Sequence, residues 1–106
     1  MISVEIFTNA DGMIAGYCVK GHSGTAKRGQ DIVCAGVSAL TQSALLGIIE
    51  HLHRTVDYDI ASGNLEMWLS EPPDDRTEAI LRTMYIGLAE IEKISPKGIQ
   101  IQEVKG

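Results

Sequence analysis

The stretch around which the chain is organised reads Gly21-His-Ser-Gly-Thr-Ala-Lys-Arg-Gly-Gln-Asp-Ile-Val-Cys-Ala-Gly-Val-Ser-Ala-Leu40. It begins where a strand pattern ends, crosses a glycine-rich loop and becomes the first turns of an apolar helix. A histidine, His22, stands at its start, and a cysteine, Cys34, lies just inside the predicted helix. The loop therefore links a candidate base to a candidate nucleophile.

The residues before this stretch predict a β-hairpin. Ile2, Val4 and Ile6 recur at every second position, which is the pattern of a strand with one buried face. The segment Asn9-Ala-Asp-Gly12 has turn-forming residues, and residues 13–20 are predicted to be the return strand.

The residues after the loop predict a long helix, with Asp31 as its N-cap and an end near His53. Polar residues interrupt the apolar stretch, so we expect a buried helix and not a membrane span. His51 and His53 lie two positions apart and do not share a helix face, so a metal site with Cys34 is not expected. The predicted buried face comprises Val33, Val37, Leu40, Ala44, Ile48 and Leu52.

The second half of the chain repeats this order. Residues 58–61 and 65–70 predict a second hairpin, in which Trp68 and Glu66 share one face. Trp68 has two interpretations: it lines a peptide groove or a dimer contact, or it packs in the ordinary way against a helix. Asp74 or Asp75 is expected to cap a second helix, whose apolar stripe comprises Ile80, Met84, Leu88, Ile91 and Ile94, and whose capping box pairs Asp75 with Glu78. Residues 99–104 predict a final strand.

These elements predict an α+β fold of order β-β-α-β-β-α-β, a largely antiparallel sheet covered by two helices. With 106 residues, the chain 1–106 has room for a single domain. Its 44% apolar and 22% charged residues are typical of a soluble protein. The N-terminal residues do not have the pattern of a signal peptide, so we expect a cytoplasmic protein. Two cysteines argue against a disulfide scaffold.

The charge of the chain disfavours direct binding of nucleic acid. The formal net charge is −5, and the acidic residues gather between residues 50 and 93. Such a surface repels a phosphate backbone and suits a basic protein partner. An acidic surface that serves only solubility is the simpler alternative.

Cys34 and His22 are the residues with the clearest chemical potential. A cysteine near a helix N-terminus is favoured as a thiolate, and a neighbouring histidine can take its proton. On the residues alone, an inert buried cysteine remains an alternative. Asp31 either caps the helix or orients His22. Ser38, one turn after Cys34, either hydrogen-bonds near the thiol or bonds back to a helix carbonyl.

The segments Gly21-His22-Ser23 and Gly29-Gln-Asp-Ile-Val-Cys-Ala-Gly-Val-Ser-Ala-Leu40 together resemble the signature of the ribosomal-processing cysteine protease family of bacteria, Prp. The hairpin, the loop and both helices also match, so the resemblance covers essentially the whole chain. It implies that His22 and Cys34 are the catalytic dyad, with Asp31 and Ser38 as supporting residues. Ser23 and Lys27-Arg28 depart from the family's usual residues but leave the dyad intact.

The resemblance implies a cysteine endopeptidase that needs no metal or cofactor. Its expected substrate is the precursor of the twenty-seventh protein of the large ribosomal subunit, from which the family removes an N-terminal extension. It also implies a homodimer, and the sequence features above lead us to expect a cytoplasmic protein with no membrane or direct nucleic-acid partner. The alternative is a non-catalytic ribosome-assembly factor that binds a ribosomal protein without cutting it.

Overall fold

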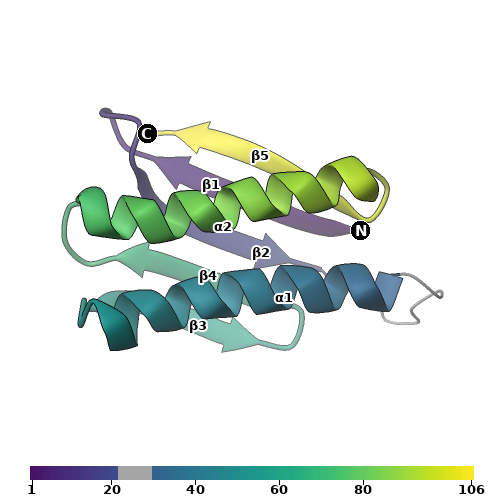
Figure 1. Ribbon diagram of the computed structural model, residues 1–106, viewed down its shortest axis with the longest axis horizontal. Helices are drawn as coiled ribbons and strands as arrows, with labels where there is room; N and C mark the ends of the chain where they lie inside the picture. The colour runs from purple at the N-terminus through teal and green to yellow at the C-terminus, as the bar shows by residue number, and fades with distance from the viewer. Residues whose placement is uncertain (22–29) are drawn as a thin grey trace.

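The computed structural model of the chain describes residues 1–21 and 30–106, and the side chains of the second range from Ile32 onward. It has two layers, a sheet and two helices that lie side by side on one face of it (Figure 1). The elements are β1 (Ile2–Thr8), β2 (Ile14–Lys20), α1 (Gln30–Leu46), the π-helical turn η1 (Gly47–His51), β3 (Val56–Ala61), β4 (Asn64–Leu69), α2 (Asp75–Ile94) and β5 (Ile99–Lys105). The predicted order of strands and helices is confirmed.

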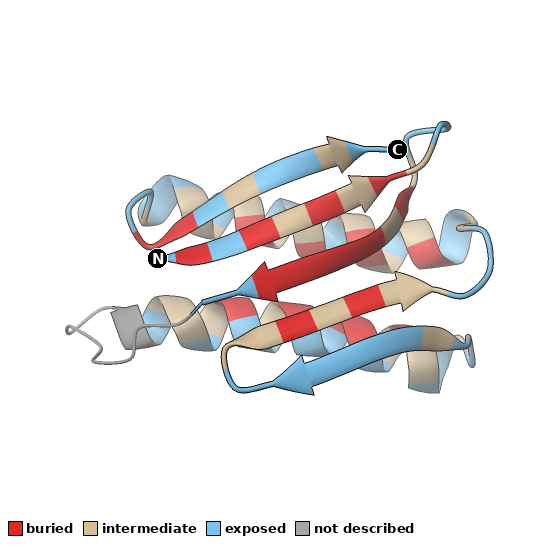
Figure 2. Ribbon diagram, turned by 180° about the vertical axis from the view of Figure 1, so that it is seen from behind, coloured by how far each residue is buried: buried red, intermediate tan, exposed pale blue. Residues whose placement is uncertain are grey.

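The sheet has the strand order β3-β4-β2-β1-β5. Neighbouring strands are antiparallel except β1 and β5, which pair in parallel, so the expected largely antiparallel sheet is confirmed. Seen from behind, the sheet lies in front of both helices, and one face carries no helix (Figure 2).

The core lies between the sheet and the helices. Alternate residues of β1 are buried because every second side chain of a strand points to the same face. The buried apolar side chains of the two helices complete this core, which comprises Ile2, Val4, Ile6, Ile14, Tyr17, Val19, Val37, Ala44, Leu45, Ile48, Leu65, Met67, Leu81, Met84, Leu88 and Ile99.

One buried hydrogen bond ties α1 to the middle of the sheet. The Tyr17 hydroxyl, on β2, donates to the carbonyl of Thr41 at 2.6 Å. The Tyr17 side chain is completely buried, and burial raises the pKa of its hydroxyl. A buried donor needs a partner, so this bond fixes where along the sheet α1 lies.

The long helix ends differently from the prediction. The α-helical part stops at Leu46, the turn η1 follows, and His53 has a positive φ of 55°. Of the predicted buried face, Val37, Ala44 and Ile48 are buried, whereas Val33, Leu40 and Leu52 pack half-buried against the core.

One helical stretch among the described residues, Ile32–His51, is long and apolar enough to cross a membrane by length and composition. Its buried residues Val37, Thr41, Ala44, Leu45 and Ile48 pack on the sheet, and this packing accounts for its apolar character. The expectation of a core helix agrees with this placement.

The N-terminus of α2 corrects the expected capping box. Asp74 is the N-cap, and its carboxylate accepts hydrogen bonds from the N–H groups of Arg76 and Thr77. The Thr77 hydroxyl accepts the return bond from the Asp74 N–H, so the box pairs Asp74 with Thr77 and not Asp75 with Glu78. Bonding to the Thr77 N–H, aided by Arg54, lowers the pKa of Asp74.

Glu78, which is not part of the capping box, connects α2 to the first hairpin. Its carboxylate accepts a hydrogen bond from the N–H of Ile14 and forms an ion pair with Arg82. At the other end of α2, the prediction that Ile94 belongs to the buried stripe is wrong, because this side chain is 83% exposed. The core side of the helix ends before it, at Leu88 and the half-buried Ile91.

Trp68 lies on the predicted face of β4 but does not pack against a helix. It contacts Phe7, with ring centroids 4.5 Å apart, on the sheet face that carries no helix. Its indole Nε1–H donates to the Glu66 carboxylate at 2.9 Å. The expectation of helix packing is therefore wrong, because β4 and β1 are close enough for the rings to meet across β2.

The buried Tyr17 hydroxyl predicts an alkaline loss of stability. Tyr17→Phe should lower the free energy of unfolding at pH 7 by about 1 kcal/mol, the usual contribution of one such hydrogen bond. Above about pH 10 the unfolded chain releases this phenolic proton while the folded chain holds it, so the wild-type advantage should shrink by up to about 1.4 kcal/mol per pH unit. Urea unfolding between pH 7 and 11 measures both effects.

Tyr58→Phe is the matched control, because the Tyr58 side chain is 56% exposed. It should leave the free energy of unfolding nearly unchanged across this pH range. If wild type and Tyr17→Phe lost stability in parallel above pH 10, the role given to the buried hydroxyl would be wrong.

Candidate active site

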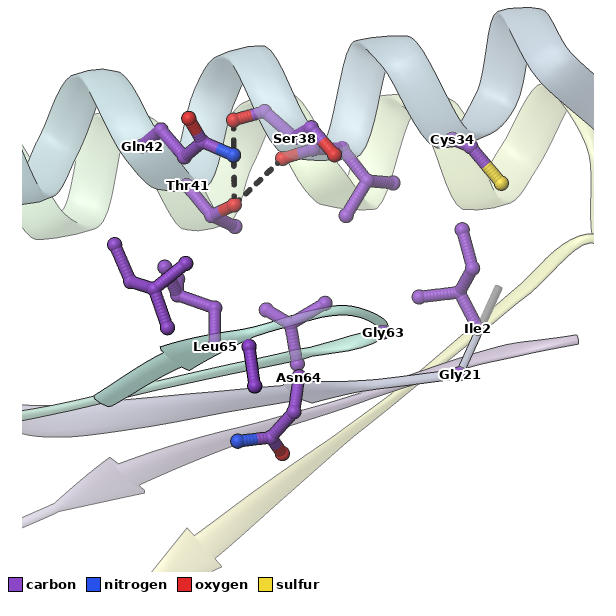
Figure 3. A pocket seen from close by; sticks show the side chains of 13 residues that line it. Ile2, Gly21, Cys34, Ser38, Thr41, Gln42, Gly63, Asn64 and Leu65 are labelled. Carbon is purple, nitrogen blue, oxygen red and sulfur yellow. Dashed lines mark hydrogen bonds between the residues drawn. The ribbon is translucent and has the colours of Figure 1, made fainter. Parts of the chain in front are cut away.

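Cys34 and Ser38 line the same pocket between α1 and the sheet, together with Val37 and Thr41 (Figure 3). Residues three and four apart lie on the same side of a helix, so one wall of the pocket is a single face of α1. The pocket has a volume of about 160 Å³. The structure thus brings Cys34 and Ser38 together, as their spacing predicts.

The opposite wall comes from the ends of strands. Ile2 and Val19 contribute from β1 and β2, and Gly21 follows β2. Gly63 lies in the turn between β3 and β4, and Asn64 is the first residue of β4. Figure 3 shows the Cys34 side chain on the side of the pocket where Ile2 and Gly21 lie. The wall opposite α1 therefore combines three segments: the start of β1, the end of β2 and the turn from β3 into β4.

Gly21 is held in a conformation that only glycine adopts easily. Its φ is +92°, and a Cβ at this position would lie 2.7 Å from the carbonyl oxygen of Met1. Its N–H donates to the carbonyl of Gly63 at 2.9 Å, which fastens the end of β2 to the β3–β4 turn. The next residue in the sequence is His22, so the candidate base directly follows a residue of the pocket wall.

His22 itself lies outside the described residues, together with the rest of the loop 22–29. The expected contact between His22 and Cys34 stays a prediction. The side chain of Asp31 is also outside the described part, so its role toward His22 stays a prediction too.

The start of α1 corrects two expectations about position. The helix begins at Gln30, so Asp31 is its second residue and not its N-cap. With Asp31 as the N-cap, Cys34 would be the third helical residue, whereas it is the fifth. An acidic residue in the first turn still stabilises the helix dipole. The effect of the dipole weakens beyond that turn, so the helix start offers the Cys34 thiol less stabilisation of a negative charge than the sequence indicated.

Thr41 is a site residue that the sequence analysis did not identify. Its hydroxyl donates back to the Val37 carbonyl at 2.8 Å and lies 3.4 Å from the Ser38 carbonyl oxygen, and its own carbonyl accepts the Tyr17 bond. The spacing of Thr41 three residues after Ser38 was the signal that placed it on this face. Thr41 makes the kind of back-bond that was one of the two roles considered for Ser38, whose own side chain is exposed at the pocket. Which role Ser38 has stays a prediction.

Cys18 lies away from this pocket, on the sheet face without helices. It pairs across the sheet with Glu5 on β1 and Glu66 on β4, and it is 4% exposed. Burial raises the pKa of its thiol; Lys20 opposes this, and the two glutamates add to it. Cys18 and Cys34 are not joined by a disulfide bond, as expected of this chain. Cys18 has the environment of an inert structural thiol.

A metal site formed by Cys34, His51 and His53 was not expected from the sequence. Within residues 1–21 and the described part from residue 30 onward, no three His, Cys, Asp or Glu side chains lie close enough to hold an ion. His51 and His53 are both exposed, at the far end of the long helix from Cys34.

Comparison with known proteins shows the family to which the chain belongs. A family model described as cysteine protease Prp matches residues 1–100. The chain belongs to this family. It is accordingly a cysteine protease, and the resemblance drawn from the Gly21–Leu40 stretch is confirmed.

The relatives share both sequence and fold with the chain. The ribosomal processing cysteine protease Prp of Staphylococcus aureus strain Mu50 is 30% identical over 104 residues, which cover 95% of this chain and 97% of the relative. The same match holds for the protein of strain NCTC 8325. A crystal structure of the Staphylococcus aureus protease with a substrate peptide has a TM-score of 0.89, at 28% identity, and covers 97% of this chain and 99% of its own.

Two further structures extend this comparison. The Staphylococcus aureus protease with a covalently linked product peptide has a TM-score of 0.87 at 28% identity, with the same coverage. A Streptococcus mutans protein, 19% identical, has a TM-score of 0.88 over 100% of this chain and 99% of its own, and shows the shared fold alone.

The close approach of Gly21 to Met1 predicts a large cost for adding one methyl group. Gly21→Ala should lower the free energy of unfolding by about 2–4 kcal/mol, since backbone strain at positive φ adds to a clash with a carbonyl oxygen. Denaturant unfolding measures this change.

Gly12→Ala is the matched control. Gly12 also has a positive φ, of +79°, but a Cβ there would meet nothing within 4 Å. It should cost only the strain, about 1–2 kcal/mol. Equal losses in the two variants would contradict the proposed clash at Gly21.

Proposed function

We propose that this protease removes the N-terminal extension of a large-subunit ribosomal protein, the twenty-seventh in the standard series, with Cys34 as nucleophile and His22 as general base. The observation that carries the proposal is the pocket in which Cys34 faces Gly21, the residue directly before His22. A dyad requires its two side chains to approach across one cavity, and this chain path supports such an approach.

The proposed reaction proceeds in two steps. His22 takes the Cys34 thiol proton, the thiolate attacks the carbonyl carbon of the scissile bond, and His22 returns the proton to the leaving amine. Water, activated by the same histidine, then hydrolyses the thioester and releases the acid product together with the restored thiol. The covalently linked product peptide in the Staphylococcus aureus structure supports a mechanism with a covalent intermediate.

Asp31 and Ser38 are proposed as supporting residues. Asp31 in the first turn of α1 would orient His22, as the third member of a triad does. Ser38 lies one turn after Cys34 in the same pocket, where its exposed hydroxyl is available to the substrate backbone. In this proposal Asp31 positions His22 and Ser38 positions the substrate, while Cys34 and His22 carry out the chemical steps.

The proposed substrate rests on the relatives and on charge. The relatives are named ribosomal processing proteases, and one is solved with a substrate peptide. The net charge of −5 favours a basic ribosomal protein over nucleic acid. We further propose that residues 1–106 act as one domain in a cytoplasmic homodimer. A non-catalytic assembly factor is disfavoured by the membership of a protease family.

The proposal predicts that the precursor of this ribosomal protein is shortened once, at its leader boundary. Cys34→Ala and His22→Ala should each lower the rate of cleavage by at least about 10³-fold, the scale of losing one member of a nucleophile–base unit. Intact-mass spectrometry of the precursor, sampled over time with each variant, measures the rate.

Cys18→Ala controls for the loss of a thiol as such, because Cys18 is buried on the opposite face of the sheet. It should leave cleavage nearly unchanged, and circular dichroism should show that all three variants remain folded. Wild-type cleavage by either dyad variant would refute the mechanism. An uncut precursor that wild type and Cys34→Ala bind equally well would point to a binding factor.

A further inference from the structure

Two large apolar side chains on β3 are exposed next to the Cys34 pocket. Tyr58 is 56% exposed and Ile60 is 51% exposed. In Figure 2 β3 lies at one edge of the sheet, opposite β5, and most of its length is coloured as exposed. Neighbouring apolar side chains that are exposed to solvent often mark a surface where a ligand or a partner binds.

The register of the sheet fixes the face to which these side chains belong. Tyr58 pairs with Met67 and Ile60 pairs with Leu65, and both partners are buried beneath the helices. Tyr58 and Ile60 therefore point to the side of the sheet that α1 occupies. Asp57 and Asp59 alternate with them and point to the other face.

This exposed strip continues the wall of the pocket. Ile60 and its neighbour Ala61 line the pocket that holds Cys34, Ser38 and Gln42. A cavity of about 160 Å³ is smaller than the sites that enclose a drug-sized ligand, so it has room for little more than one side chain of a polypeptide. The remainder of a peptide cut at Cys34 must leave the pocket along the surface.

The edge of β3 also offers backbone hydrogen bonds. Among the described strands, β3 pairs only with β4, so its outer edge presents N–H and C=O groups. An extended peptide that adds to such an edge gains main-chain bonds and places alternate side chains on one face. That face is the one that carries Tyr58 and Ile60.

We propose that an extended, apolar segment of the substrate polypeptide lies along β3, with its alternate side chains on Ile60 and Tyr58 and its scissile bond at Cys34. The inference rests on the proposed function, since it assigns a path to the same substrate. A second copy of the chain is the other possible occupant. Ile60 also lines the pocket that holds Cys34, so a second copy bound there would cover part of the pocket wall. Because the exposed strip is continuous with this pocket, the substrate is the favoured occupant.

The test compares three serine variants on a synthetic peptide that spans the bond cut in the precursor. Tyr58→Ser and Ile60→Ser should each lower kcat/KM by about tenfold, mainly through KM, since each removes apolar area that the peptide would bury. Ile86→Ser is the matched control, because Ile86 is 59% exposed on α2. It should leave kcat/KM unchanged.

Shortened peptides locate the segment that lies on β3. One peptide lacks residues from its N-terminal end and the other from its C-terminal end. With whichever peptide lacks the bound segment, wild type, Tyr58→Ser and Ile60→Ser should cleave equally slowly. Equal kcat/KM for all variants on the full peptide, or a tenfold loss that persists with both shortened peptides, would overturn the proposal.

Two further readouts separate the alternatives. If Tyr58→Ser and Ile60→Ser changed the sedimentation mass but not kcat/KM, the strip would be a contact between copies and the proposal would fail. If wild type cut neither precursor nor peptide, the proposed function would be wrong. The affinity of the peptide for the Cys34→Ala chain would then test the path independently. Adding Tyr58→Ser or Ile60→Ser to that chain should weaken peptide binding by about tenfold.

Discussion

The position of α1 on the sheet is the constraint on which the rest of the structure depends. One face of this helix is buried, and the hydrogen bond from Tyr17 to the Thr41 carbonyl fixes its place along β2. Because the bond and the apolar contacts of Val37 and Ile48 act on the same face, the helix cannot slide or roll without losing both. Cys34 and Ser38 therefore stand over the ends of β1 and β2.

Hydrophobic periodicity predicted most of the fold. The alternation of Ile2, Val4 and Ile6, and the three- and four-residue steps of α1, gave the correct elements because each pattern reflects a single buried face. The errors arose where several residues competed for one role. Asp74 was one of two candidate caps, and with Asp74 as the N-cap the third helical position falls on Thr77 and not on Glu78. Glu78 bonds to the distant Ile14 N–H instead.

The candidate site was predictable in part for the same reason. Cys34 and Ser38 are local to one helix, so their spacing placed them together. The other wall of the pocket comes from Ile2, Gly21 and the turn at Gly63, whose meeting depends on strand order and register. Nothing in the local sequence encodes which strands become neighbours, so the contact of Gly21 with Met1 required the structure.

The parallel pairing of β1 with β5 has a consequence for biosynthesis. β1 leaves the ribosome first among the strands and its partner β5 leaves last, so the sheet closes only after every other element has been made. Ile2, which lines the pocket, is also the residue that pairs with Ile99 at the start of β5. The nascent chain therefore carries Cys34 through the synthesis of all the later elements before Ile2 can pair with Ile99 and its place in the pocket wall is fixed.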